Sequence, residues 1–126
     1  MQPQRKKTVL IIDDSSFMRG LIRDILNRHG YRVVGEAENG INGVEKFKLL
    51  KPDIVTADIV MDEEGGMAAL DHIMHQNPDA KVIMISSLMN QAPYITEAKS
   101  KGASAFVCKP IDEKTLIDAI TSITGI

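Results

Sequence analysis

Short apolar runs rich in Val and Ile alternate along this chain with longer segments in which apolar residues recur every three or four positions. The first pattern is typical of buried strands and the second of amphipathic helices. Strict alternation predicts repeated strand–helix units, hence an α/β domain with a parallel sheet and helices on both faces, a doubly wound arrangement. The expected strands are 8–12, about 32–36, 53–57, 82–85 and 105–108.

Turn and capping residues mark the ends of the expected helices. Ser15 or Ser16 is placed to cap the first helix and Asp112 the last, because short polar side chains accept bonds from the free N–H groups of a first turn. Gly30 and Gly102 are expected to end two of the helices. The helix with the weakest apolar face is expected at about 92–101, with an inner face formed by Tyr94, Ile95 and Ala98.

The composition is that of an ordinary globular domain. The 126 residues are 44% hydrophobic and 25% charged, and the formal net charge of −2 gives no electrostatic reason to expect nucleic-acid binding. One domain is expected at 8–126, behind a tail at 1–7. The apolar run at 9–12 that follows this basic tail is too short for a signal peptide or a membrane span. We therefore expect a cytoplasmic protein, and the single cysteine, Cys108, fits a reducing compartment and buried packing.

Polar residues follow the expected strands at the points where the strands end. Asp13 and Asp14 follow the first strand, Asp58 the third, Ser86 the fourth and Lys109 the fifth. The carboxyl ends of parallel strands meet at one edge, so these side chains should converge. Each pair of carboxylates at ~4 Å repels by about 4 kcal/mol at an effective dielectric of ~20, so the cluster requires a cation. Oxygen ligands favour Mg²⁺ or a similar hard divalent ion.

Each of these residues has a simpler interpretation when it is taken alone. A lone aspartate after a strand is usually a cap or a turn residue. Ser86 lacks the Gly-x-Ser-x-Gly surroundings of a hydrolase nucleophile, and no histidine is placed to act as its base. His72 and His75 have a spacing compatible with zinc but are expected on a solvated helix face. The combination of the polar strand ends is therefore the informative signal.

That combination resembles the receiver domains of two-component response regulators, and CheY-like members in particular. The resemblance covers essentially the whole chain and rests on the acid pair, the lone Asp58, Ser86 and the Lys109-Pro110 dipeptide, in this order. It implies the flavodoxin-like sheet with strand order 2-1-3-4-5. It also implies a signalling domain that undergoes self-phosphorylation and autodephosphorylation and is not otherwise an enzyme.

The resemblance also assigns a role to each polar residue. Asp58 corresponds to the phosphoacceptor. Mg²⁺ would be held by Asp14 and Asp58 directly, by Asp13 mostly through water, and by the backbone carbonyl of Val60. Lys109 and Ser86 would contact the phosphoryl oxygens, and Phe106 corresponds to an aromatic residue that changes rotamer on activation. One departure is Asp62, which stands where family members usually have proline.

The resemblance extends to expected partners. The segments 14–19 and 35–40 look most like the chemotaxis members, which implies a chemotaxis-type sensor histidine kinase upstream and the flagellar motor switch downstream. No nucleic-acid or membrane partner is expected. Two alternatives remain: a receiver domain cut from a longer response regulator or hybrid kinase, and a phosphohydrolase of the haloacid dehalogenase type. The hydrolase would place an Asp-x-Asp pattern after its first strand, whereas this chain has adjacent Asp13 and Asp14 there.

Overall fold

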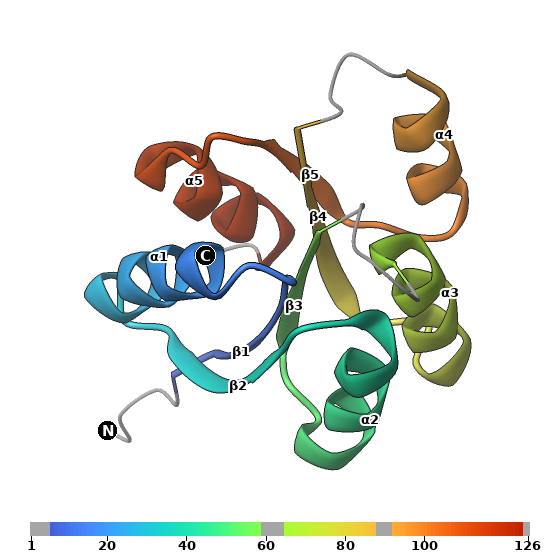
Figure 1. Ribbon diagram of the computed structural model, residues 1–126, viewed down its shortest axis with the longest axis horizontal. Helices are drawn as coiled ribbons and strands as arrows, with labels where there is room; N and C mark the ends of the chain where they lie inside the picture. Colours follow the sequence, from blue (N-terminus) through green and yellow to red (C-terminus); the bar gives the residue numbers. More distant parts are fainter. Residues whose placement is uncertain (1–5, 59–64, 88–91, 125–126) are drawn as a thin grey trace.

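Parallel strands form one five-stranded sheet in the computed structural model of the chain, which describes residues 6–58, 65–87 and 92–124 (Figure 1). Their order across the sheet is β2-β1-β3-β4-β5. The predicted doubly wound α/β fold with strand order 2-1-3-4-5 is therefore confirmed. The strands are β1 (Thr8–Ile12), β2 (Arg32–Ala37), β3 (Ile54–Asp58), β4 (Lys81–Ser86) and β5 (Ala105–Cys108).

Helices cover both faces of the sheet. The first and last helices pack on one face and the middle three on the other, so that two separate apolar cores form (Figure 1). None of the helices in the described ranges is long and apolar enough to cross a membrane. The helices are α1 (Ser16–Arg28), α2 (Gly40–Leu50), α3 (Gly66–Gln76), α4 (Ala92–Ser100) and α5 (Glu113–Thr124).

The predicted helix ends are found in the structure. The Ser15 hydroxyl accepts a hydrogen bond from the backbone N–H of Met18 at 3.2 Å, so Ser15 is the cap of α1. The Asp112 carboxylate accepts from the backbone N–H of Thr115 at 3.1 Å and caps α5 in the same way. Beyond the ends of α1 and α4, Gly30 and Gly102 adopt left-handed backbone with φ of 84° and 102°. These are positions at which a side chain would be strained.

The inner face predicted for α4 is correct only in part. Ala98 is fully buried and Ile95 is half-buried, but Tyr94 is 39% exposed, so the prediction that it faces inward is wrong. The helix lies at the edge of the sheet beside β5 (Figure 1). Helical spacing alone cannot indicate how far the packing surface extends.

Helix α2 packs very closely on the end of β1. A Cβ atom at Gly43 would lie 2.5 Å from the Cδ1 atom of Ile12, closer than real carbon atoms approach. Glycine at this position therefore allows α2 to rest on Ile12, the residue that immediately precedes the first acidic residue of the predicted cluster.

Candidate functional site

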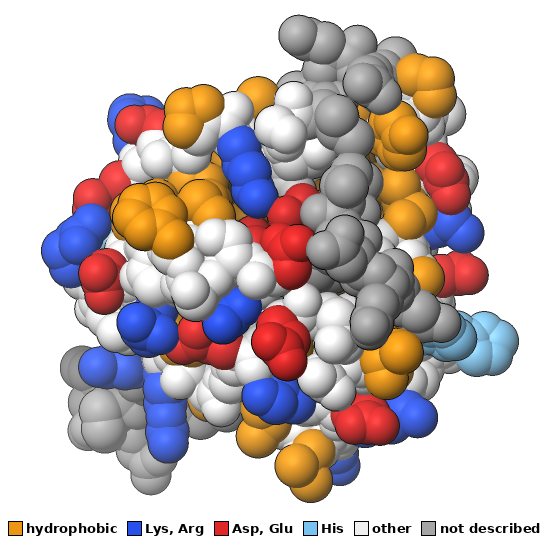
Figure 2. Space-filling model, viewed as in Figure 1, with side chains coloured by type: hydrophobic (Ala, Val, Ile, Leu, Met, Phe, Trp, Pro, Cys, Tyr) orange, Lys and Arg blue, Asp and Glu red, His pale blue; other side chains and the backbone are white. Residues whose placement is uncertain are grey.

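The strand register brings the three predicted acidic residues together. Ile12 pairs with Ala57, so Asp13 follows β1 beside Asp58 at the end of β3. Asp13, Asp14 and Asp58 each offer a carboxylate oxygen within 4.8 Å of the other two. The predicted convergence of the carboxylates is thus found at the carboxyl edge of the sheet. In the space-filling view, acidic and basic side chains adjoin near the centre of this face (Figure 2).

Lys109 lies between two of these carboxylates. Its Nζ atom donates a hydrogen bond to Asp58 Oδ2 at 2.8 Å and is 3.4 Å from Asp13 Oδ2. The lysine is held in place because its own backbone N–H donates to the carbonyl oxygen of Ser86 at 3.0 Å, which extends the pairing of β4 with β5. One cation therefore partly neutralises two buried anions.

Asp13 is the most deeply buried acid of the cluster, with a relative exposure of 1%. Its Oδ1 atom accepts a hydrogen bond from the backbone N–H of Ser15 at 2.9 Å, while Oδ2 accepts none from the described residues. Burial raises the pKa of this carboxyl. The Ser15 N–H and the charge of Lys109 lower it without cancelling the effect of burial, and the Asp58 charge adds to the increase.

The pKa of Lys109 is raised overall by opposing influences. Burial is the largest of them and lowers the pKa, but the hydrogen bond and charge of Asp58, together with those of Asp13, outweigh it. The ammonium form is therefore secure at neutral pH. Lys109 provides a fixed positive charge beside Asp58.

Other predicted residues have more varied positions. Ser86 is buried at the end of β4, 2% exposed, and pairs with Cys108. Val60, the predicted carbonyl ligand, and Asp62 lie outside the described residues. His72 and His75 are exposed on α3, which confirms the prediction of a solvated face.

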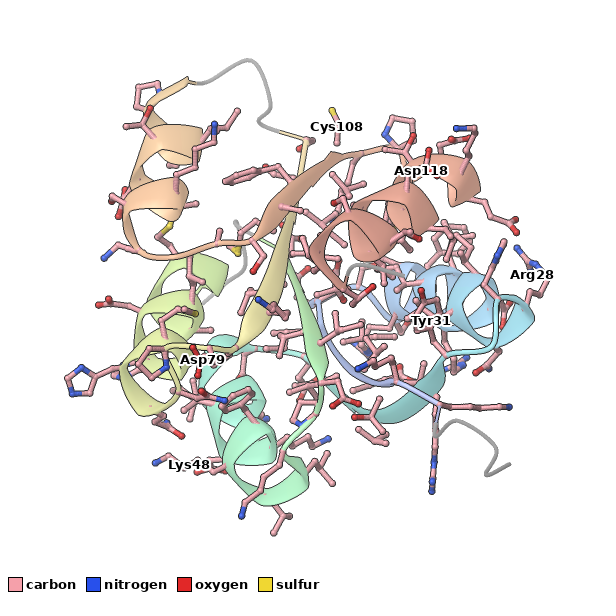
Figure 3. All side chains as sticks on the ribbon, turned by 180° about the vertical axis from the view of Figure 1, so that it is seen from behind. Arg28, Tyr31, Lys48, Asp79, Cys108 and Asp118 are labelled. Atoms are coloured by element: carbon pink, nitrogen blue, oxygen red, sulfur yellow. The ribbon has the colours of Figure 1, made fainter. Side chains whose placement is uncertain are left out.

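The predicted burial of Cys108 is wrong. Its side chain is exposed and points away from the body of the domain (Figure 3). Cys108 is the last residue of β5, which is an edge strand of the sheet. Phe106, two residues before Cys108, is half-buried. The Lys99 ammonium of α4 lies 5.8 Å from the centre of the Phe106 ring, within the range of a cation–π contact.

Sequence reasoning missed two residues that support the cluster. The Arg19 guanidinium donates from Nη1 to the backbone carbonyl of Asp13 at 2.7 Å, and its Nε lies 3.4 Å from Oε1 of Glu36 on β2. Both contacts depend on how α1 and β2 meet in space. No spacing in the sequence pointed to them.

The cluster has the donors that a magnesium ion requires. The carboxylates of Asp13, Asp14 and Asp58 supply hard oxygen ligands, and Oδ2 of Asp13 is a buried oxygen that accepts no hydrogen bond from the described residues. A divalent cation there would offset the repulsion that Lys109 only partly relieves. The residues present therefore fit Mg²⁺.

Comparison with known proteins gives the class to which this fold and site belong. Residues 9–121 match the family described as the response regulator receiver domain, and the chain belongs to that family. It is thus a signalling domain of two-component systems and not a conventional enzyme. The haloacid dehalogenase alternative is not favoured.

Within this family the chain is similar to chemotaxis proteins. It is 46% identical to the chemotaxis protein CheY of Thermotoga maritima, over 94% of this chain and 98% of that protein. The response regulator domain of Thermotoga maritima CheB has a TM-score of 0.88 at 37% identity and covers 97% of this chain and 98% of that one. CheY in a CheX–CheY–BeF3–Mg complex from Borrelia burgdorferi has a TM-score of 0.89 at 33% identity and covers 94% and 89%.

Proposed function

We propose that this receiver domain accepts a phosphoryl group from a sensor histidine kinase on Asp58, in the presence of Mg²⁺, and changes its partner binding as a result. The observation that carries the proposal is the contact of 2.8 Å between Lys109 Nζ and Asp58 Oδ2, within a cluster of three carboxylates. A merely structural aspartate would not need two further acids beside it, because their repulsion weakens the fold.

The residues of the cluster have distinct parts in the transfer. A carboxylate oxygen of Asp58 forms a bond to phosphorus while the bond from phosphorus to the donor's histidine nitrogen breaks, and the leaving imidazole takes up a proton. Lys109 and the Ser86 hydroxyl bind phosphoryl oxygens. Phosphoryl transfer depends mainly on such positioning and on neutralisation of oxygen charge.

The metal would be held by the cluster's remaining donors. Asp13, Asp14 and Asp58, with the backbone carbonyl of Val60, would bind Mg²⁺. The bound ion would supply positive charge to the phosphoryl oxygens.

The relatives support a proposal for the partners. Because the similar proteins include chemotaxis CheY proteins, and one is described in a complex with CheX, BeF3 and Mg, we propose a chemotaxis-type kinase upstream and the flagellar motor switch downstream. The signalling unit would be 8–126, preceded by a tail at 1–7, in the cytoplasm.

Labelling by a small phosphodonor tests the proposal. Acetyl phosphate with Mg²⁺ should add one phosphoryl group to the wild type, and Asp58→Asn should abolish the mass increase while the variant stays folded. Asp53→Asn is the matched control, because Asp53 precedes the same strand at its opposite end. Full labelling of Asp58→Asn in intact-mass spectra would refute the assignment, and loss of labelling in Asp53→Asn would show that the assay reports only folding.

A further inference from the structure

Arg19 reaches the acid cluster through the backbone. Its Nη1 atom donates to the carbonyl oxygen of Asp13 at 2.7 Å, and its Nε atom lies 3.4 Å from Glu36 Oε1. The side chain is only 18% exposed, so these contacts are sheltered from competing water. A single planar guanidinium thus joins the segment after β1 to the end of β2.

The end of β2 therefore holds Asp13 at two points. The backbone N–H of Asp13 donates to the carbonyl oxygen of Ala37 at 2.9 Å. The carbonyl of the same residue is tied through Arg19 to Glu36, the neighbour of Ala37. Both hydrogen-bonding groups of the Asp13 backbone are fixed to adjacent residues of one strand.

Glu36 is itself well anchored. Its Oε2 atom accepts a hydrogen bond from Arg23 Nη1 at 2.5 Å, and its backbone carbonyl accepts one from Lys46 Nζ on α2. The contact with Arg23 already restricts the rotamers of the Glu36 side chain. Its additional contact with Arg19 therefore costs little further conformational entropy.

The carbonyl held by Arg19 belongs to the peptide group that joins Asp13 to Asp14. Fixing its oxygen fixes the plane of that peptide and with it the positions of the Asp14 N and Cα atoms, from which the side chain extends. Asp14 needs such support, because its side chain is exposed and makes no hydrogen bond within the described residues. Without a brace, repulsion from Asp13 and Asp58 would favour rotation of Asp14 towards solvent.

We propose that Arg19 is a positioning residue that locks the Asp13–Asp14 peptide, so that both carboxylates face Asp58 and form a pre-arranged cation site. The part of this inference that concerns Mg²⁺ rests on the proposed function, whereas the locking of the peptide does not. Residues that orient metal ligands without touching the metal commonly change affinity by about 10–100-fold.

The charge of Arg19 and its positioning role predict opposite changes in cation affinity when Arg19 is removed. If Arg19 acted only as a nearby positive charge, its removal would strengthen cation binding, because one source of repulsion would be gone. If it positions the peptide, its removal weakens binding. Arg19→Lys keeps the charge but cannot bridge two acceptors with a planar fork, so it should also weaken binding.

The test is an NMR comparison of the wild type with Arg19→Ala, Arg19→Lys and the control Arg23→Ala. Arg23 binds the same Glu36 carboxylate but makes no bond to Asp13. In metal-free protein, Arg19→Ala should speed hydrogen exchange of the Ser15 amide, which donates to Asp13 Oδ1. Titration with MgCl₂ should show affinity reduced by about tenfold in Arg19→Ala and to a smaller extent in Arg19→Lys. Arg23→Ala loosens the Glu36 anchor but keeps both contacts of Arg19, so it should change both measurements much less than Arg19→Ala does.

Several results would overturn the inference. These are unchanged or tighter Mg²⁺ binding in Arg19→Ala, full restoration by Arg19→Lys, and equal losses in Arg23→Ala and Arg19→Ala. If the wild type failed to respond to MgCl₂, the proposed function would fail, while the exchange rate of the Ser15 amide would still decide whether Arg19 locks the peptide.

Discussion

Each end of β3 carries an aspartate, and the two have opposite surroundings. At the amino end, Asp53 faces Thr8 of β1. The Asp53 carboxylate accepts hydrogen bonds from the Thr8 backbone N–H at 2.8 Å and from its hydroxyl at 3.0 Å. The Asp53 backbone N–H donates to the same hydroxyl at 2.9 Å. The charge is stabilised by neutral donors, and the arrangement ties two strands together.

At the carboxyl end, Asp58 faces two further carboxylates and one lysine. The charges there are not balanced by the described side chains, and the pKa of Asp13 is raised as a consequence of its burial and of the Asp58 charge. The same type of side chain therefore stabilises the fold at the amino end of the strand and introduces charge repulsion at the carboxyl end. Ionisable groups with perturbed pKa values and incompletely balanced charges are typical of functional sites.

Removal of Lys109 should have the largest effect on stability. Lys109→Ala leaves Asp13 and Asp58 buried without their cation, and breaking such a pair costs about 3 kcal/mol. The raised pKa of Lys109 means that its contribution is present at neutral pH and is lost only as the pH rises through the folded-state pKa. Urea unfolding at pH 7 without metal measures the loss. Lys48→Ala, which removes an exposed lysine of α2 (Figure 3), should change nothing.

Magnesium should stabilise the folded domain by binding at the carboxyl end of β3. A ligand that binds only the folded state adds about 2.7 kcal/mol at a hundredfold excess over its Kd. Asp14→Ala should abolish this gain, and without metal it should itself raise stability, because one repelling charge is gone. Thermal unfolding with and without MgCl₂ measures both effects. If MgCl₂ did not change the Tm of the wild type, the inference that the unbalanced carboxylates bind magnesium would be wrong.

Substitution at the amino end should separate stability from signalling. Asp53→Ala removes partly buried hydrogen bonds to a charged group and should cost about 2 kcal/mol. Labelling of Asp58 by acetyl phosphate should be retained at temperatures where the variant is folded. Urea unfolding and mass spectrometry on the same samples make the comparison. A folded Asp53→Ala protein that could not be labelled would show that the two ends are coupled.

The smallest expected effect is a gain in stability. The raised pKa of Asp13 means that its ionised form disfavours the folded state at neutral pH, and the penalty disappears as the pH falls through the folded-state pKa. Asp13→Asn should therefore raise the free energy of unfolding at pH 7, and the Tm with it. The difference should vanish towards the ordinary value of 3.8. Asp79→Asn, at an exposed aspartate outside the cluster (Figure 3), is the control variant for this measurement.

The features predicted correctly from the sequence are those set by short-range physics. The Ser15 and Asp112 caps, and the glycines that end α1 and α4, depend on neighbouring residues alone. The convergence of the acids followed from a general property of parallel sheets. Their positions along the chain were sufficient for that inference.

The features that were missed depend on contacts between distant segments. Thr8 and Asp53 meet only because β1 and β3 pair in one register, and Arg19 meets Glu36 only through the packing of α1 beside β2. The exposure of Tyr94 and Cys108 depends on where the sheet stops. An apolar pattern indicates which side of an element faces inward, but it does not indicate how much structure lies beneath it.

The cluster draws its groups from the residues after β1, the last residue of β3 and the residue after β5, and this has a consequence during synthesis. The aspartates are synthesised before Lys109, and the sheet cannot place the lysine until β5 has paired with β4. An unfinished chain therefore carries the three aspartates without the lysine that contacts two of them in the folded domain. Under the proposed function, a nascent chain without β5 would therefore compete poorly with finished chains for the phosphoryl donor.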